Sequence, residues 1–235
     1  MRTILILLLT AAPLGAEELV FQDDFKNGLA EGWKWVREDP KAWRSTPEGL
    51  EIRVLPGNMW GPPNNAKNVL VRPAPDPGPD RIEVSVKVEN KPAGQYEQVD
   101  LVWYYNDSNM VKIGLEQVDK KLCVVMGREE KDRTRTIAVL PKGTPIMRLR
   151  LSVQGDKIRG HYRPEGATIW VKAGECTLPA AGKPKLSLQV YQGTLKVERW
   201  AKIIASVLFV IIIIGAVASV RQNIVAFFIQ AGPVT

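Results

Sequence analysis

Val99-Asp-Leu-Val-Trp-Tyr-Tyr-Asn-Asp-Ser-Asn-Met-Val-Lys-Ile-Gly-Leu-Glu116 is the stretch that decides the fold. In each half, apolar residues occupy every second position, at 99, 101 and 103 and again at 111, 113 and 115, which is typical of strands with one apolar face. The polar residues 106–109 between the halves favour a tight turn. The stretch therefore predicts an antiparallel hairpin whose other face carries Tyr, Lys and Glu side chains, as in a sandwich that binds a ligand on one sheet.

Similar short runs recur along the 235-residue chain, separated by turns that use many of its 17 Pro and 19 Gly residues. Such short runs, roughly 8 to 14 residues apart, predict an all-β sandwich of single-domain size. Besides the hairpin, the expected strands are residues 19–25, 33–37, 50–54, 68–72, 81–88, 121–126, 136–139, 147–153, 157–162, 169–171 and 185–191, and residues 56–65 form a loop that carries Trp60.

The two ends of the chain predict export and membrane anchoring. Residues 1–16 have the basic start, short apolar run and small-residue end of a signal peptide. Cleavage after Ala12 and an uncleaved anchor remain alternatives. Residues 203–220 carry no charge and, at about 1.5 Å each, nearly match the hydrocarbon layer. They predict a transmembrane helix, followed by an apolar tail to residue 235, and hence an extracytoplasmic sandwich.

A second interpretation of the C-terminus is a closing strand through about Ile204, followed by a segment that is foreign to the fold.

The net charge of +7 is spread among acidic residues, as in Arg128-Glu-Glu-Lys-Asp-Arg133, so nucleic acid is excluded as a partner. Cys123 and Cys176 lie in the exported part, where a disulfide is permitted, but the sequence leaves both pairing and free thiols open. It also leaves the oligomeric state open.

Five motifs carry a resemblance to a known family: Trp-x-Trp-x-Arg at 33–37, Gly-Leu-Glu-Ile-Arg at 49–53, Asn-Val-Leu-Val-Arg at 68–72, the run at 104–116, and Leu-Arg-Leu to Trp at 149–170. In this order they resemble the domain-of-unknown-function 1349 family, which is similar to the C-terminal module of family 43 β-xylosidases. The resemblance implies a two-sheet jelly roll of the concanavalin A-like lectin/glucanase superfamily over residues 17–201. It also implies a concave sheet that can hold saccharide, without a catalytic domain.

Candidate ligand-binding residues combine aromatic rings, which stack on sugars, with polar side chains that bind hydroxyl groups. We expect them to share one face of the sandwich: Trp35, Arg37, Tyr104, Lys112, Glu116, Arg128, Gln189 and Tyr191. Two simpler interpretations remain, in which the Lys112–Glu116 pair is only an exposed ion pair and the other tryptophans fill the core: Trp33, Trp43, Trp103 and Trp170.

A retaining glycosidase on such a sandwich needs two carboxylates about 5 Å apart, and only residues at even offsets on a strand share a face. Glu97 and Asp100 are three residues apart, although Asp100 can meet Glu116 across strands. We expect no catalytic residue and no cofactor; Asp23 and Asp24 are candidate ligands of a structural Ca²⁺ ion. The resulting hypothesis is a non-catalytic, membrane-anchored carbohydrate-binding module. The alternatives are a glycoside hydrolase-like enzyme and a structural or protein-interaction sandwich without a sugar ligand.

Overall fold

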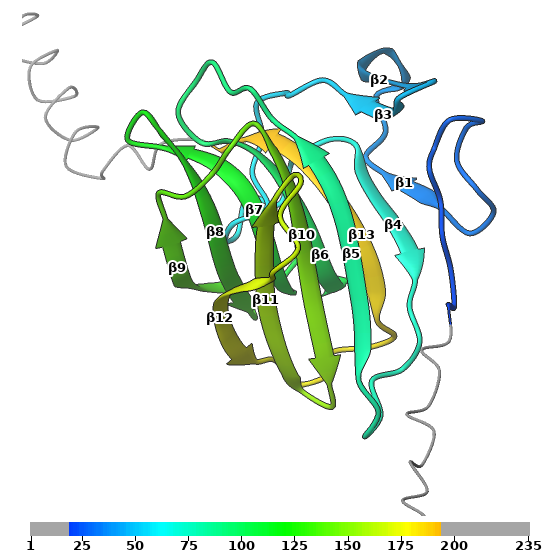
Figure 1. The fold of residues 1–235 in the computed structure, drawn as a ribbon. Helices are drawn as coiled ribbons and strands as arrows, with labels where there is room; N and C mark the ends of the chain where they lie inside the picture. The colour runs from blue at the N-terminus through cyan, green and yellow to red at the C-terminus, as the bar shows by residue number, and fades with distance from the viewer. Residues whose placement is uncertain (1–18, 194–235) are drawn as a thin grey trace, which may run out of the picture. The chain divides into compact units, whose positions relative to one another are not determined.

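The computed structural model describes residues 19–193, which form two antiparallel sheets packed face to face and a small two-stranded sheet (Figure 1). The larger sheet has seven strands in the order β1-β4-β13-β6-β7-β8-β9, and the second has four in the order β12-β11-β10-β5. β2 and β3 pair separately. The strands are β1 (Lys34–Val36), β2 (Trp43–Thr46), β3 (Gly49–Ile52), β4 (Val69–Pro73), β5 (Ile82–Glu89), β6 (Glu97–Asn106), β7 (Asn109–Val118), β8 (Lys121–Glu130), β9 (Arg133–Leu140), β10 (Ile146–Gln154), β11 (Lys157–Pro164), β12 (Val171–Thr177) and β13 (Lys185–Gln192).

The predicted hairpin is present as β6 and β7, which lie in the middle of the large sheet. Its apolar positions face the four-stranded sheet and form the main core. Trp103, predicted as a core residue, is completely buried there. Side chains of both sheets complete this core: Leu101, Ile113, Leu115, Met126, Met147, Leu149, Leu151 and Val153. Alternation along two central strands thus builds the apolar layer between the sheets.

The other face of the seven-stranded sheet, here the outer face, is also largely buried. A second apolar cluster lies on it, formed by strand residues and by Met59 from a loop: Met59, Ala66, Val69, Val71, Val102, Tyr104, Met110 and Tyr191. The strands described here and both clusters belong to one compact unit, which ends at Gly193. Residues 19–193 therefore have a core of their own.

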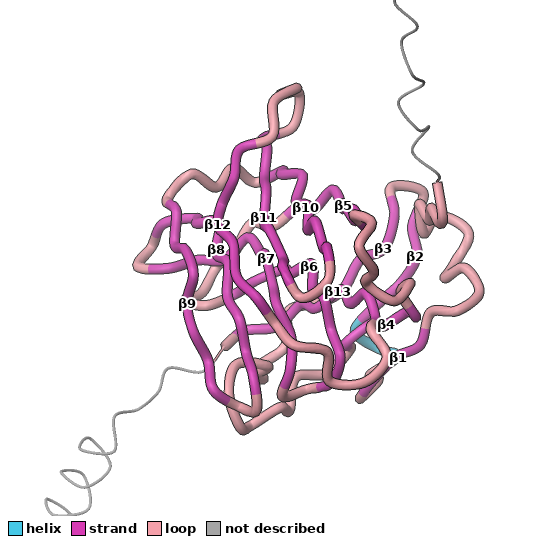
Figure 2. Tube along the Cα trace, turned by 90° about the horizontal axis from the view of Figure 1, so that it is seen from below, coloured by secondary structure: helices cyan, strands magenta, loops and turns pink. Residues whose placement is uncertain are grey.

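Only one helix occurs among the described residues, the short 3-10 turn η1 (Pro40–Ala42), seen beside β1 in Figure 2. Accordingly, nothing in residues 19–193 provides a helix with the length and apolar character of a membrane span. The predicted signal peptide, residues 1–16, and the predicted span, residues 203–220, lie outside the described part.

Residues 19–25 do not form the expected strand. Instead the carboxylate of Asp23 organises a turn, because it accepts hydrogen bonds from the backbone N–H of Phe25 at 2.8 Å and of Ala30 at 3.0 Å. Its Oδ2 also accepts from Trp33 Nε1 at 3.0 Å. These local bonds satisfy the side chain without a neighbouring strand.

Three of the four tryptophans assigned to the core are only partly buried: Trp33, Trp43 and Trp170. Each lies outside the two central strands, at an edge or in a loop. Cys123 and Cys176 are free thiols, so no disulfide links them. The register explains this, since Cys123 pairs with Glu116 on the outer face, whereas Cys176 packs against the main core.

Candidate functional site

The candidate site lies on the outer face of the seven-stranded sheet. The register of β6, β7 and β13 aligns Gln189 with Asp100, and Val102 with Lys112. Residues directly opposite in neighbouring strands point to the same face. Lys112 and Glu116, four residues apart on β7, therefore lie on the same face as Asp100.

Lys112 is at the centre of this face. Its Nζ lies 3.5 Å from Asp100 Oδ2 and 3.4 Å from Glu116 Oε2, and it also donates to Gln98 Oε1. Only 4% of the Lys112 side chain is exposed. Asp100 and Glu116, from neighbouring strands, thus approach the same ammonium group.

The charges of this cluster depend on one another. Burial alone would lower the pKa of Lys112, but the negative charges of Asp100 and Glu116 raise it above its ordinary value. Burial also raises the pKa of Asp100 to about 6, against the effect of the nearby Lys112. Since a buried charge needs a partner, the ammonium group holds the two carboxylates in place.

A loop, residues 56–66, crosses this face and covers the cluster; we call it the Trp60 loop. It begins at a bridge between Pro56 and Gln192, at the end of β13. The indole of Trp60 then lies above Gly127 of β8, where a Cβ atom would stand 2.8 Å from Cζ3. Lys112 Nζ lies 5.4 Å from the centre of the Trp60 ring, within cation–π range. Trp60 itself remains partly exposed.

Glu129 ties the Trp60 loop to β8. Its Oε2 accepts a hydrogen bond of 3.0 Å from the backbone N–H of Gly61, and the side chain is fully buried. Burial raises the pKa of Glu129 to about 7, although the hydrogen bond from Gly61 lowers it. The carboxyl group therefore changes its charge near neutral pH.

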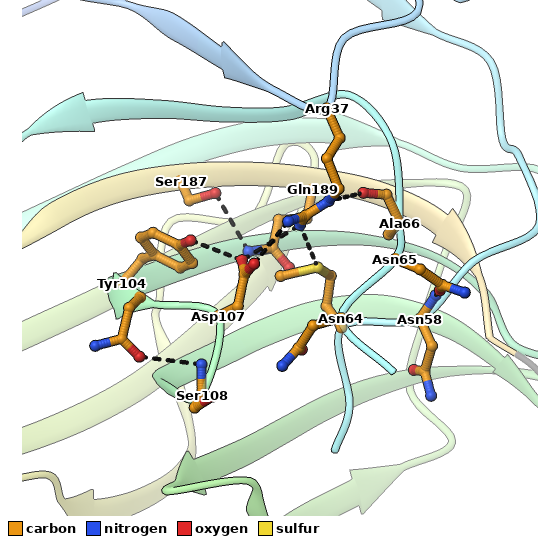
Figure 3. A network of polar contacts seen from close by, with 12 residues as sticks. Arg37, Asn58, Asn64, Asn65, Ala66, Tyr104, Asp107, Ser108, Ser187 and Gln189 are labelled. Atoms are coloured by element: carbon orange, nitrogen blue, oxygen red, sulfur yellow. Dashed lines mark hydrogen bonds and ion pairs between the residues drawn. The ribbon is translucent and has the colours of Figure 1, made fainter. Parts of the chain in front are cut away.

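The far end of the Trp60 loop is held by a network of Arg37, Asp107 and Tyr104 (Figure 3). Both terminal nitrogens of Arg37 donate to Asp107, at 2.6 and 3.2 Å, and its Nε donates to the carbonyl of Ala66 at 2.7 Å. Tyr104 donates its hydroxyl to Asp107 at 2.7 Å. The hairpin turn and the loop end are thus joined by charge-assisted hydrogen bonds.

Several buried polar atoms on this face have no hydrogen-bond partner among the described residues. They are mainly acceptors and come from β6, β8 and β13: Asp100 Oδ1, Glu129 Oε1, Gln189 Oε1 and the Tyr191 hydroxyl. Buried acceptors require a donor, so hydroxyl groups are their natural complement.

Five of the eight predicted ligand residues lie together on the outer face: Tyr104, Lys112, Glu116, Gln189 and Tyr191. Arg37 also reaches this face, because its φ of +55° ends the alternation of β1. Most of these side chains are buried beneath the Trp60 loop, whereas 11% of the Glu116 side chain stays exposed.

Trp35 and Arg128 are not on the expected face. Trp35 pairs with Leu70 and thus points to the opposite side, where its ring packs at a tilt of 42° against Trp43, with ring centres 4.8 Å apart. Arg128 follows Gly127, which lies on the outer face, so the Arg128 side chain points to the opposite face. There it forms an ion pair with Glu130. The register between strands decides both positions, and the sequence of one strand does not reveal it.

Four residues of the cluster were not predicted as ligand contacts: Trp60, Gln98, Asp100 and Glu129. The alternation of β6 places Gln98 and Asp100 on the same face as Tyr104, so the sequence did contain a signal for these two residues. As for metal ions, the described residues contain no group of three His, Cys, Asp or Glu side chains that could bind one. Asp23, a predicted calcium ligand, is occupied by N–H donors, and Asp24 pairs with Lys26 at 3.7 Å.

A family model, the β-xylosidase C-terminal concanavalin A-like domain, matches residues 22–180. The chain belongs to this family. Membership confirms the predicted concanavalin A-like sandwich and its relation to the family 43 module; the narrower 1349 family remains a prediction. The family is a C-terminal domain of these glycoside hydrolases rather than their catalytic part, in agreement with the prediction that the domain is not itself an enzyme.

Solved structures show the same fold. The GH43 protein BlXynB from Bacillus licheniformis has a TM-score of 0.64 and 20% identity, over 74% of this chain and 36% of its own. A xylan β-1,4-xylosidase from Bacillus halodurans C-125 has a TM-score of 0.62 and 16% identity, over 78% of this chain and 38% of its own. A functionally unknown protein from Saccharomyces cerevisiae has a TM-score of 0.54 and 14% identity, over 68% of this chain and 86% of its own. The chain thus spans little more than a third of the two bacterial proteins. Comparison with curated proteins gave no match.

Proposed function

We propose that this chain is a non-catalytic carbohydrate-binding module that binds saccharide on the outer face of the seven-stranded sheet, beside Trp60. The observation that carries the proposal is a partly exposed aromatic ring held over a buried cluster of charged side chains. Aromatic rings stack on the apolar faces of sugars, while polar groups beside them fix the hydroxyl groups. Thr136, exposed on β9, supplies polar atoms on the open part of this face, where the largely buried Glu116 still shows 11% of its side chain.

In this proposal the predicted ligand residues have two roles. Trp60 and Glu116 contact the saccharide, and Lys112 orients Glu116 through their 3.4 Å ion pair. The buried Tyr104, Gln189 and Tyr191 support the floor under the Trp60 loop, and Arg37 holds the loop end. Binding then depends on a preformed loop rather than on flexible side chains, which lowers its entropic cost.

Xylo-oligosaccharides are the first ligands to test, because β-xylosidases carry domains of this family. The test is an array that displays xylo-oligosaccharides among other glycans, incubated with the protein of residues 19–193. Reproducible binding to one class of glycan supports the proposal. If no glycan binds while a partner protein co-purifies, the protein-interaction alternative replaces it.

We also propose that the module is exported and membrane-anchored, with residues 1–16 as signal peptide and residues 203–220 as the span. External protease applied to intact cells should then destroy an epitope in the sandwich and spare one placed after Thr235. A protected sandwich epitope would contradict this orientation. Recovery of the full chain in the soluble fraction would contradict the span.

A further inference from the structure

The four-stranded sheet has a solvent face that the saccharide proposal does not use. In β10, Leu149 and Leu151 point into the core, so Arg148 and Arg150 point outward. β11 places Arg163 opposite Arg148 on the same outward face. We call this surface the basic face.

Carboxylates on the basic face are outnumbered. Glu165 is shared by Lys87, at 3.2 Å, and Arg148, at 3.3 Å. Glu175 is likewise shared by Arg159 and Lys172. Glu83 is shared by Arg150, at 3.0 Å, and Arg81, at 3.4 Å. A carboxylate that serves two cations neutralises only one of them, so positive charge remains.

Arg163 has no carboxylate partner among residues 19–193; its Nη1 donates to the carbonyl of Thr168 at 3.1 Å. Its guanidinium carbon lies 4.7 Å from the centre of the Trp170 ring, and that of Arg150 lies 4.0 Å from it. These two contacts fix the partly exposed indole at the basic face. Next to it, Ile169 is 77% exposed and is the most exposed large hydrophobic side chain of the described part.

We infer that the basic face docks on a membrane surface that contains anionic lipids. Tryptophan is suited to the interface between headgroups and acyl chains, and nearby arginines are attracted by lipid phosphates and carboxylates. Ile169 gains free energy when it leaves water for this layer. An acidic polysaccharide would satisfy the arginines but would offer no apolar layer for Ile169, so a lipid surface fits more of the observations.

The test uses the protein of residues 19–193, which contains every described strand and both apolar clusters. It is sedimented with vesicles of phosphatidylcholine alone and with vesicles that also contain phosphatidylserine. We expect binding only to the vesicles with phosphatidylserine, and a loss of binding as salt concentration rises. Equal partitioning into both kinds of vesicle would overturn the inference.

Variants separate the two contributions. The double variant Arg150→Gln/Arg163→Gln should bind vesicles about 30-fold more weakly, because each basic residue near the surface contributes roughly fivefold. Ile169→Ser should weaken binding roughly tenfold. Matched controls are Arg53→Gln and Val20→Ser, since both residues are exposed and lie outside the four-stranded sheet; they should bind like the wild type.

Unchanged binding in the double variant would overturn the inference, and so would binding to polygalacturonate without binding to vesicles. Trp60→Ala should leave vesicle binding intact. The lipid inference and the saccharide proposal therefore fail independently, because they use opposite faces of the sandwich.

Discussion

Trp60 occupies the space above Gly127, where a Cβ atom would stand 2.8 Å from Cζ3 of the indole. Gly127→Ala should therefore displace the ring and, with it, the Trp60 loop. We expect a loss of about 1 to 3 kcal/mol in unfolding free energy and weaker saccharide binding. Chemical denaturation and binding titration check this.

The control is Gly78→Ala, because a Cβ atom at Gly78 meets no other atom within 4 Å. It should leave both quantities unchanged. In the double variant Trp60→Ala/Gly127→Ala, the added methyl group should cost little, since the ring that it displaces is gone. An equal cost of Gly127→Ala with and without Trp60 would show that the ring is not the neighbour that matters.

Lys112→Met should leave Asp100 and Glu116 without their cation on a buried face. Breaking a buried ion pair in this way costs about 3 to 5 kcal/mol, and thermal or urea unfolding measures it. Lys87→Met, which removes an exposed ion pair with Glu165, should cost less than about 1 kcal/mol. Similar losses in the two variants would mean that the Lys112 cluster is open to water.

Glu129 should make stability depend on pH. Because burial raises its pKa in the folded state from 4.5 to about 7, the folded state holds this proton more tightly than the unfolded state. The contribution of Glu129 is thus most favourable below about pH 4.5 and decreases by roughly 3 kcal/mol as the pH rises through 7. Glu129→Gln retains an acceptor for Gly61 and should stabilise the protein more at pH 8 than at pH 5. Urea unfolding at both values tests this, and an equal effect at both would contradict the assigned shift.

Arg37 and Asp107 should be coupled energetically, because two hydrogen bonds join them and Arg37 also holds Ala66. A double-mutant cycle of Arg37→Ala and Asp107→Ala should give a coupling of about 1 to 2 kcal/mol. The same cycle on the exposed pair Arg44 and Glu51, whose Nη2 and Oε2 atoms are 2.6 Å apart, should give a coupling energy of less than about 1 kcal/mol. Coupling no larger than in this control would mean that the network does not fix the loop.

The hairpin shows how much of the site could be predicted from sequence. Alternation is a local property of a strand, so residues 99–116 correctly predicted a buried Trp103 and a shared face for Tyr104, Lys112 and Glu116. The positions of Trp35 and Arg128 depend on the pairing between strands, which a single strand does not encode.

Residues 56–65 were predicted as a loop that carries Trp60, but the path of this loop over the sheet was not predicted. Residues 56–66 contain too many Pro, Gly and Asn residues for a regular element, and no periodicity predicts where such a segment lies. Its position over Lys112 follows from distant contacts, such as Gly61 with Glu129 and Ala66 with Arg37. As a result, most predicted ligand residues became the floor of the site rather than its surface.

Saccharide binding by Trp60→Ala is the most direct test of the proposed function. The ligand is the glycan that binds best on the array, and titration compares the wild type with Trp60→Ala and with Trp43→Ala. Trp43 is the control because it packs against Trp35, away from the outer face. Loss of ring stacking should weaken binding by about 1 kcal/mol or more in Trp60→Ala, roughly a factor of five to ten, and leave Trp43→Ala unchanged. Equal affinity in the wild type and a folded Trp60→Ala variant would place the saccharide site elsewhere.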